Sequence, residues 1–104
     1  MIKHVAMWKL KDEFRGAKLR TTFQEIKKRF EPVLTTIDGM FSLELGMNGN
    51  TTDPVVADVV LISTHKDWAA LKIYQNHPLH LEIAKYVGSV RDTRTVVDFE
   101  VEKK

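Results

Sequence analysis

The chain has 104 residues, of which 43% are hydrophobic and 29% are charged, and its 16 lysines and arginines exceed its 14 aspartates and glutamates by a formal net charge of +2. This length predicts one domain over residues 1–104, large enough to bury a core without cross-links. The absence of cysteine excludes disulfides, thiolate metal sites, a cysteine nucleophile and dithiol redox chemistry, and the near-balanced charge argues against a nucleic-acid partner.

The distribution of apolar residues argues against a membrane span or a secretory signal. Apolar runs such as Val59–Ile62 are much shorter than the about 18 residues of a spanning helix. Lys3, Lys9 and Lys11 interrupt the apolar residues near the N-terminus, where a signal would need a continuous apolar core. We therefore expect no membrane partner and a cytoplasmic location.

Residues 1–10 predict a strand that is apolar on both faces. Side chains alternate between the faces of a strand, so His4 and Trp8 share one face with residues 2 and 6, while Val5 and Met7 share the other. Between residues 16 and 36 the apolar residues instead recur every three or four positions, which predicts an amphipathic helix. Pro32 is expected to distort or shorten its last turns, and residues 38–39 are expected to form a turn.

Two strands are predicted next. Alternation over residues 41–47 places Phe41, Leu43, Leu45 and Met47 on one side of the first. Residues 57–64 predict a second strand that is apolar on both faces apart from Asp58. Residues 48–54 between them have the composition of a surface loop.

The last third of the chain predicts two helices and a strand. Asp67 is a suitable N-cap for a helix through Tyr74. Pro78 is suited to the first position of a helix and disfavours a helical conformation for the residue before it, so His77 is the expected cap of a second helix to about Val90. Residues 93–101 alternate as a fourth strand.

The order of these elements is β-α-β-β-α-β, with the second helical segment in two pieces. It predicts an α+β ferredoxin-like fold, in which helices cover one face of a four-stranded antiparallel sheet. Because two strands are apolar on both sides, the second face would expose a large apolar patch. We expect a second copy of the chain to cover it, giving a homodimer through the open sheet face that approximates a dimeric α/β barrel.

Several segments, in order and spacing, resemble the stress-responsive dimeric α/β-barrel family. The resemblance spans nearly the whole chain, and its most specific part is the Tyr-x-x-His-Pro-x-His motif at residues 74–80. The other segments are Met1–His4 leading into Trp8–Glu13, Gly39–Gly46, Ala57–Leu61 and Val96–Phe99. The family implies a homodimer whose two sheets form a shared barrel, and it implies no single reaction.

The enzymatic relatives that this resemblance brings in are plant polyketide (olivetolic acid) cyclases, which close a linear poly-β-ketone by aldol chemistry. Their cavity residues correspond to His4, Tyr74 and His80 in this chain. Two further polar residues of those cyclases, a histidine and a tyrosine, correspond to Asp58 and roughly to Ile26 here. The resemblance thus implies that this chain has three of the polar groups of the cyclase cavity and lacks two others.

The residues themselves point to His80 as a candidate base. As the third residue of a helix that Pro78 opens, it lies where the helix dipole disfavours imidazolium. It is expected to point inward, within reach of Tyr74, and a neutral imidazole with a phenol can remove a carbon-bound proton and hold the developing enolate oxygen. The alternative is that His77 and His80 only cap the helix and hydrogen-bond across the kink.

His4 and Trp8 have similar alternatives. On an apolar strand face, His4 is a ligand-binding group, a base or a hydrogen-bonded core residue. Trp8, with Trp68 and Phe99, is either a stacking surface for a flat ligand or haem, or core packing. The candidate ligand-binding set is therefore His4, Trp8, Tyr74, His77 and His80, of which His4, Tyr74 and His80 are the catalytic candidates.

No metal site and no cofactor is predicted. The pair His77 and His80 has no acidic or cysteine ligand at a recognisable spacing. The leading functional hypothesis is a stress-associated barrel that binds a small apolar or aromatic molecule between its helices and sheet. The alternatives are a cyclase or isomerase acting on a β-keto substrate, a cofactor-free mono-oxygenase-like barrel, and a purely structural oligomer.

Overall fold

The computed structural model describes residues 1–50 and 55–102. The strands in this part of the chain are β1 (Ile2–Leu10), β2 (Met40–Met47), β3 (Val59–His65) and β4 (Arg91–Glu100). The helices are α1 (Leu19–Phe30), α2 (Val33–Thr36), α3 (Trp68–Asn76) and α4 (Pro78–Val90), with short 3₁₀ turns η1 (Asp12–Phe14) and η2 (Gly16–Lys18) before α1. The predicted α+β ferredoxin-like order is confirmed.

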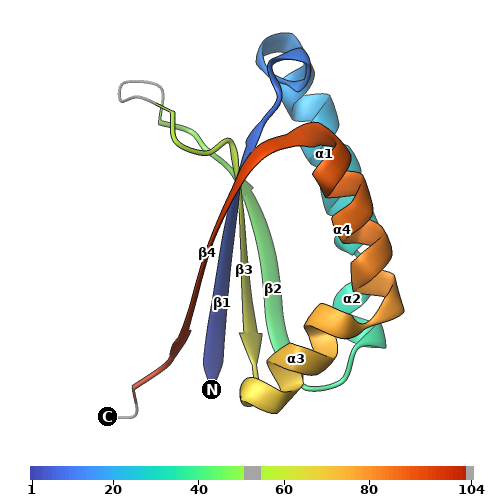
Figure 1. Cartoon of the computed structure of the whole chain (residues 1–104), viewed down its shortest axis with the longest axis vertical. Coiled ribbons are helices and arrows are strands. Elements are labelled where there is room, and N and C mark those ends of the chain that lie inside the picture. The colour runs from blue at the N-terminus through green and yellow to red at the C-terminus, as the bar shows by residue number, and fades with distance from the viewer. Residues whose placement is uncertain (51–54, 103–104) are drawn as a thin grey trace.

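The four strands form one sheet in the order β2-β3-β1-β4, with every neighbouring pair antiparallel. All the labelled helices lie on one face of this sheet, and the other face has no helix over it (Figure 1). β1 is central: its residue Ala6 is paired with Leu61 of β3 on one side and with Val96 of β4 on the other. Residues at both ends of the chain therefore lie next to each other in the sheet.

The predicted helix over residues 16–36 is interrupted where Pro32 stands. α1 ends at Phe30, Pro32 occupies the cap position before α2, and α2 is only one turn long. Proline has no backbone N–H and its ring crowds the preceding turn, so a regular helix is strongly disfavoured there. The inner face of α1 buries Phe23, Ile26 and Phe30 against the sheet, as the three- and four-residue spacing predicts.

Both predicted caps of the later helices are present. The side chain of Asp67 accepts a hydrogen bond from the Ala70 N–H at 2.8 Å at the start of α3. The Nδ1 atom of His77 accepts from the Leu79 N–H at 3.1 Å at the start of α4. His77 is extended, with φ −66° and ψ 136°, so the chain leaves α3 and changes direction before Pro78 begins α4.

One strand departs from the predicted alternation. Phe41 was expected to share a buried side with Leu43 and Leu45, but 58% of its surface is exposed. The pairing of β2 with β3 shifts between Met40 and Ser42, which is a bulge that takes Phe41 out of the alternating pattern. Of the predicted loop at 48–54, residues 51–54 lie outside the described residues.

The two faces of β1 have different surroundings. On the helix side, Ile2, Ala6, Trp8 and Leu10 are buried in the core. On the other side the strand register brings apolar residues of three strands together, because Val5 is paired with Ile62 and Val97, and Met7 with Val60. With Phe99 they form what we call the open-face patch: Val5, Met7, Val60, Ile62, Val97 and Phe99.

No helix within residues 1–50 and 55–102 is long and apolar enough to cross a bilayer.

The turn before β2 provides a test of the packing between the helices and the sheet. Gly39 has φ +85°, and a Cβ atom placed on it would lie 2.8 Å from the Cβ of Ala70 in α3. Gly16 has φ +63° but has open space where its Cβ would lie. An L-residue costs roughly 1–2 kcal/mol in the left-handed region, and forced overpacking about 1–3 kcal/mol more.

We therefore expect Gly39→Ala to lower the free energy of unfolding by about 1–3 kcal/mol more than Gly16→Ala does. Urea denaturation followed by circular dichroism measures both values. Equal losses for the two variants would show that α3 does not pack closely on this turn.

Candidate functional site

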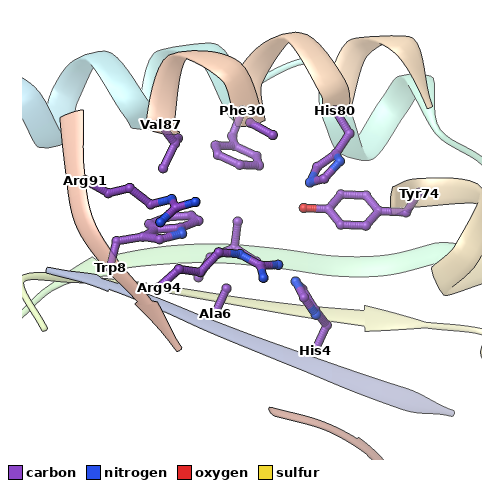
Figure 2. Close-up of a pocket in the computed structure, with 11 residues that line it drawn as sticks. His4, Ala6, Trp8, Phe30, Tyr74, His80, Val87, Arg91 and Arg94 are labelled. Carbon is purple, nitrogen blue, oxygen red and sulfur yellow. The ribbon is translucent and has the colours of Figure 1, made fainter. Parts of the chain in front are cut away.

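A cavity of about 200 Å³ lies between the helix-side face of the sheet and the helices above it (Figure 2). Its wall is formed by apolar, aromatic and basic side chains from β1, β3, β4, α1, α3 and α4. The lining residues are His4, Ala6, Trp8, Phe30, Leu61, Tyr74, His80, Ala84, Val87, Arg91 and Arg94.

The structure brings together four of the five predicted ligand-binding residues. His4 and Trp8 come from the helix-side face of β1, Tyr74 from the last turns of α3 and His80 from the first turn of α4. Figure 2 shows the ends of Tyr74 and His80 meeting at one side of the cavity, with His4 reaching toward them from the sheet. His77 does not line the cavity and caps α4 instead.

The aromatic rings of this site are in contact. The ring centroids of Tyr74 and His80 are 4.4 Å apart, and those of Tyr74 and His4 are 5.9 Å apart. The contact of Tyr74 with His80 depends on the break at His77, because the turn there sets the end of α3 beside the start of α4. The spacing of the Tyr-x-x-His-Pro-x-His motif thus becomes a geometry that joins a phenol to an imidazole.

A backbone hydrogen bond determines which nitrogen of His80 carries its proton. Nδ1 of His80 lies 3.1 Å from the carbonyl oxygen of Gln75. A carbonyl only accepts hydrogen bonds, so Nδ1 is the donor, and the neutral ring leaves its lone pair on Nε2. Burial lowers the pKa of His80 from its usual 6.5, and the nearby charge of Arg94 acts in the same direction. His80 is therefore a neutral imidazole with an unprotonated Nε2.

His4 has an acidic partner that the sequence analysis did not identify. Its Nδ1 lies 2.5 Å from Oδ1 of Asp98 on the neighbouring strand β4, and only 3% of His4 is exposed. Nδ1 donates a hydrogen bond to this carboxylate, which holds the ring in one orientation. The register that pairs His4 with Asp98 across the two strands produces this contact.

Tyr74 supplies a hydroxyl that remains protonated. Burial raises the pKa of Tyr74 above its usual 10, and only 1% of the residue is exposed. In Figure 2 the hydroxyl oxygen points into the cavity rather than into the protein core. Tyr74 is thus a hydrogen-bond donor for an oxygen atom of a bound molecule.

A third histidine lies behind Tyr74 and was not predicted. The ring centroids of His65 and Tyr74 are 5.0 Å apart, and Ser63 Oγ lies 2.8 Å from Nε2 of His65. Burial lowers the pKa of His65 to about 4, so the ring is neutral near pH 7. His65 does not line the cavity, and its contact with Tyr74 helps to fix the orientation of the phenol.

Two arginines of β4 also line the cavity. Arg94 is paired with Trp8 and Arg91 with Leu10, so both lie beside the helix-side face of β1. The alternation predicted for this strand did not say which of its two faces the helices cover. The structure places Arg94 and Asp98 with Val96 on the helix side and leaves Val97 and Phe99 on the open one. Alternation alone shows which residues share a face, and not which face the helices cover.

Asp58 and Ile26, the two positions at which the resemblance implied missing polar groups, have structural roles. Asp58 accepts a hydrogen bond from the Leu10 N–H at 2.8 Å and pairs with Arg15 at 3.2 Å. Ile26 is fully buried in α1. Neither lines the cavity. Among the described residues, no group of three histidine, aspartate or glutamate side chains is arranged to hold a metal ion.

The site therefore combines the unprotonated Nε2 of His80, a second imidazole from His4, a phenolic donor and apolar side chains. Such groups can exchange a proton with a bound molecule and donate a hydrogen bond to its carbonyl or hydroxyl oxygen. The geometry is compatible with binding alone and with general acid–base chemistry.

Solved structures of similar fold come from several organisms. A dimeric protein of unknown function from Bacteroides fragilis superposes with a TM-score of 0.84 at 24% identity, over 96% of this chain and 95% of that one. A Dabb family protein from Mesorhizobium loti superposes with a TM-score of 0.76 at 16% identity, over 98% and 97%. A hydroxynitrile lyase from Passiflora edulis superposes with a TM-score of 0.81 at 14% identity, over 99% and 94%.

These similarities confirm the ferredoxin-like fold, and the relative from Bacteroides fragilis is described as dimeric. A comparison with curated protein sequences finds no match. Residues 2–101 match the model of the Stress responsive A/B Barrel Domain family, called Dabb. Because that match covers almost the whole chain and agrees with the fold, this protein belongs to the stress-responsive A/B barrel (Dabb) family.

Proposed function

We propose that the protein binds a small apolar or aromatic molecule in the cavity beside His4, Tyr74 and His80. The observation that carries this proposal is the cavity itself, which has a volume of about 200 Å³ and is lined by apolar side chains together with two histidines, a tyrosine and two arginines. A cavity of about 150 Å³ lined by apolar side chains is large enough for benzene. The ligand we expect has one ring or a short branched chain, with an oxygen atom that accepts from Tyr74.

Filling the cavity entrance tests this proposal. Ala84 lines the cavity from α4 and is exposed, so a larger side chain there can cover the entrance without entering the core. We expect 4-ethylphenol to bind saturably to the wild-type protein and at least about tenfold more weakly to Ala84→Phe, a loss of about 1.4 kcal/mol. Titration by nuclear magnetic resonance, following backbone amides around the cavity, measures both affinities.

Ala69→Phe is the matched control, because Ala69 is also an exposed helical alanine but does not line the cavity. It is expected to bind the probe like the wild type. Equal binding by Ala84→Phe would mean that the probe binds elsewhere.

A second candidate function is proton transfer on a carbonyl compound, as in a cyclase or isomerase of β-keto substrates. The tautomer of His80 favours it, because Nε2 is an unprotonated base beside the Tyr74 hydroxyl. The fold is also that of the Passiflora edulis hydroxynitrile lyase, so the scaffold is compatible with an enzyme.

In this mechanism His80 Nε2 removes a proton from the carbon next to a carbonyl group. Tyr74 donates a hydrogen bond to the carbonyl oxygen, where the negative charge of the enolate develops. Return of the proton to a different carbon completes an isomerisation. Attack of the enolate carbon on a second carbonyl, with the proton passing to the new alkoxide, completes an aldol closure. His4, oriented by Asp98, is the second group placed to relay a proton.

Deuterium exchange at carbon isolates the first step of this mechanism. We expect the protein to accelerate exchange at the central carbon of acetylacetone, and His80→Ala to lower the protein-dependent rate by about 10²–10⁴-fold, the usual contribution of a general base. Loss of 1H signal in D2O measures the rate. Leu81→Ala, a change at an exposed neighbour outside the cavity, is expected to keep it.

The pH dependence has a defined sign. A base acts in its deprotonated form, and burial lowers the pKa of His80 below 6.5, so the rate should fall with decreasing pH along a curve whose midpoint lies below 6.5. A midpoint at or above pH 6.5, or a rate unchanged in His80→Ala, would exclude His80 as the base.

We also propose that a second copy of the chain covers the open-face patch. Its apolar residues come from three adjacent strands, and the Bacteroides fragilis relative is described as dimeric. Burial of such a patch between two identical sheets removes it from water in both copies at once.

Matched charge substitutions test this interface. Val97 in the patch is 54% exposed, and Ile73 on α3 is 56% exposed. We expect Val97→Asp to shift the protein toward a monomer, because two unpaired carboxylates would be buried close to an apolar interface, and Ile73→Asp to leave the assembly unchanged. Sedimentation velocity measures the mass. A dimer in both variants would place the contact elsewhere.

A further inference from the structure

We propose that the ligand carries a carboxylate group that binds to Arg91 and Arg94. This inference rests on the proposed binding function and adds the chemical class of the molecule. It comes from the charge of the cavity wall rather than from the histidines and the tyrosine, and neither arginine was among the residues predicted from the sequence.

The position of the two arginines is the first argument. They are three residues apart at the start of β4, and both line the cavity. In Figure 2 Arg91 and Trp8 lie at one end of the view, the side chain of Arg94 extends toward the middle, and Tyr74 and His80 lie at the opposite end. A molecule that spans the cavity would meet a guanidinium group and the Tyr74 hydroxyl at different points along its length.

The second argument is that neither arginine has an acidic partner in the part of the chain that the structure describes. Asp98 is engaged with His4, and Asp58 with Arg15. Across residues 1–50 and 55–102, neither Arg91 nor Arg94 forms an ion pair with any acidic side chain. The residues that line the cavity include these two arginines and no acidic side chain. Apolar side chains cannot hydrogen-bond to a guanidinium group, whereas a bound anion can pair with it and stabilise its charge.

The third argument concerns the shape of the group. A guanidinium presents planar, parallel donors that match the two oxygens of a carboxylate. Trp8 and Phe30, whose rings stack 6.4 Å apart at their centroids, provide a flat apolar surface next to the arginines. The class of ligand that matches these features is a monocarboxylate with an aromatic or short aliphatic body.

Two probes of the same shape separate charge from apolar fit. We would compare 4-propylbenzoate with its neutral analogue 4-propylbenzamide. Trp8 lines the cavity while Trp68 is 52% exposed on α3, and the chain has two tryptophans, so Trp68→Phe leaves Trp8 as the single fluorescent reporter. Quenching of Trp8 then measures both affinities in this background.

We expect the benzoate to bind at least about tenfold more tightly than the benzamide. Arg91→Gln combined with Arg94→Gln should bring this ratio close to one while the affinity for the benzamide changes little. Arg20→Gln, at an exposed position of α1 outside the cavity, should preserve the ratio. Circular dichroism of each variant verifies that it is folded.

The outcomes distinguish this inference from the proposed function. If both probes bind equally to the parent protein, the cavity binds small molecules and the carboxylate inference is wrong. Tighter binding of 4-propylphenyl phosphate than of the benzoate would also overturn it. If neither probe binds saturably at millimolar concentrations, the proposed function fails and this inference fails with it.

Discussion

The break between α3 and α4 is the local feature on which the site depends. Pro78 has no backbone N–H to continue a helix, and it holds His77 in an extended conformation. The His77 N–H bonds to the Tyr74 carbonyl and its side chain caps α4, so the turn is closed at both ends. As a result, the end of one helix and the beginning of the next direct Tyr74 and His80 to the same point above the sheet.

A polar group among apolar walls is stable only if its remaining hydrogen-bonding atoms are satisfied. For His80 and His4 the satisfied atom is Nδ1, through Gln75 and Asp98 respectively. For His80 this leaves the Nε2 atom with its lone pair, a state set by the surrounding protein before any ligand enters. His65 differs, because its Nδ1 has no hydrogen-bond partner among the described residues, and it lies behind Tyr74 rather than in the cavity wall.

Local signals predicted part of the site, and long-range pairing produced the rest. The motif at residues 74–80 is a short, continuous segment. Residue spacing, the proline and the capping preferences were therefore enough to place Tyr74, His77 and His80. Asp98 is 94 positions from His4, and its contact depends on the register between β1 and β4. Alternation in β4 places Arg94 and Phe99 on opposite faces of the strand, but it does not show which face the helices cover. Only the packing of the complete sheet decides that.

The bulge in β2 illustrates the same limit, since Phe41 continues the apolar pattern in sequence while a register shift removes it from the buried side. The register between two strands depends on all the residues of both strands. A single bulge can therefore move neighbouring side chains to the other face of the sheet, although nothing in the local sequence indicates it.

The alternation of β1 and β4 also ties the cavity to the proposed dimer. Within β1, His4 and Trp8 face the cavity while Val5 and Met7 between them face the open side. In β4, Arg94 and Asp98 lie on the helix side, while Val97 and Phe99 lie on the open side.

β4 is an edge strand held in the sheet by β1 alone, so its position sets both the His4–Asp98 contact and the placement of the arginines. A second copy that covers the open face would restrain this strand from the side opposite the cavity. The dimer we propose would therefore help to order the binding site without contributing a residue to its wall.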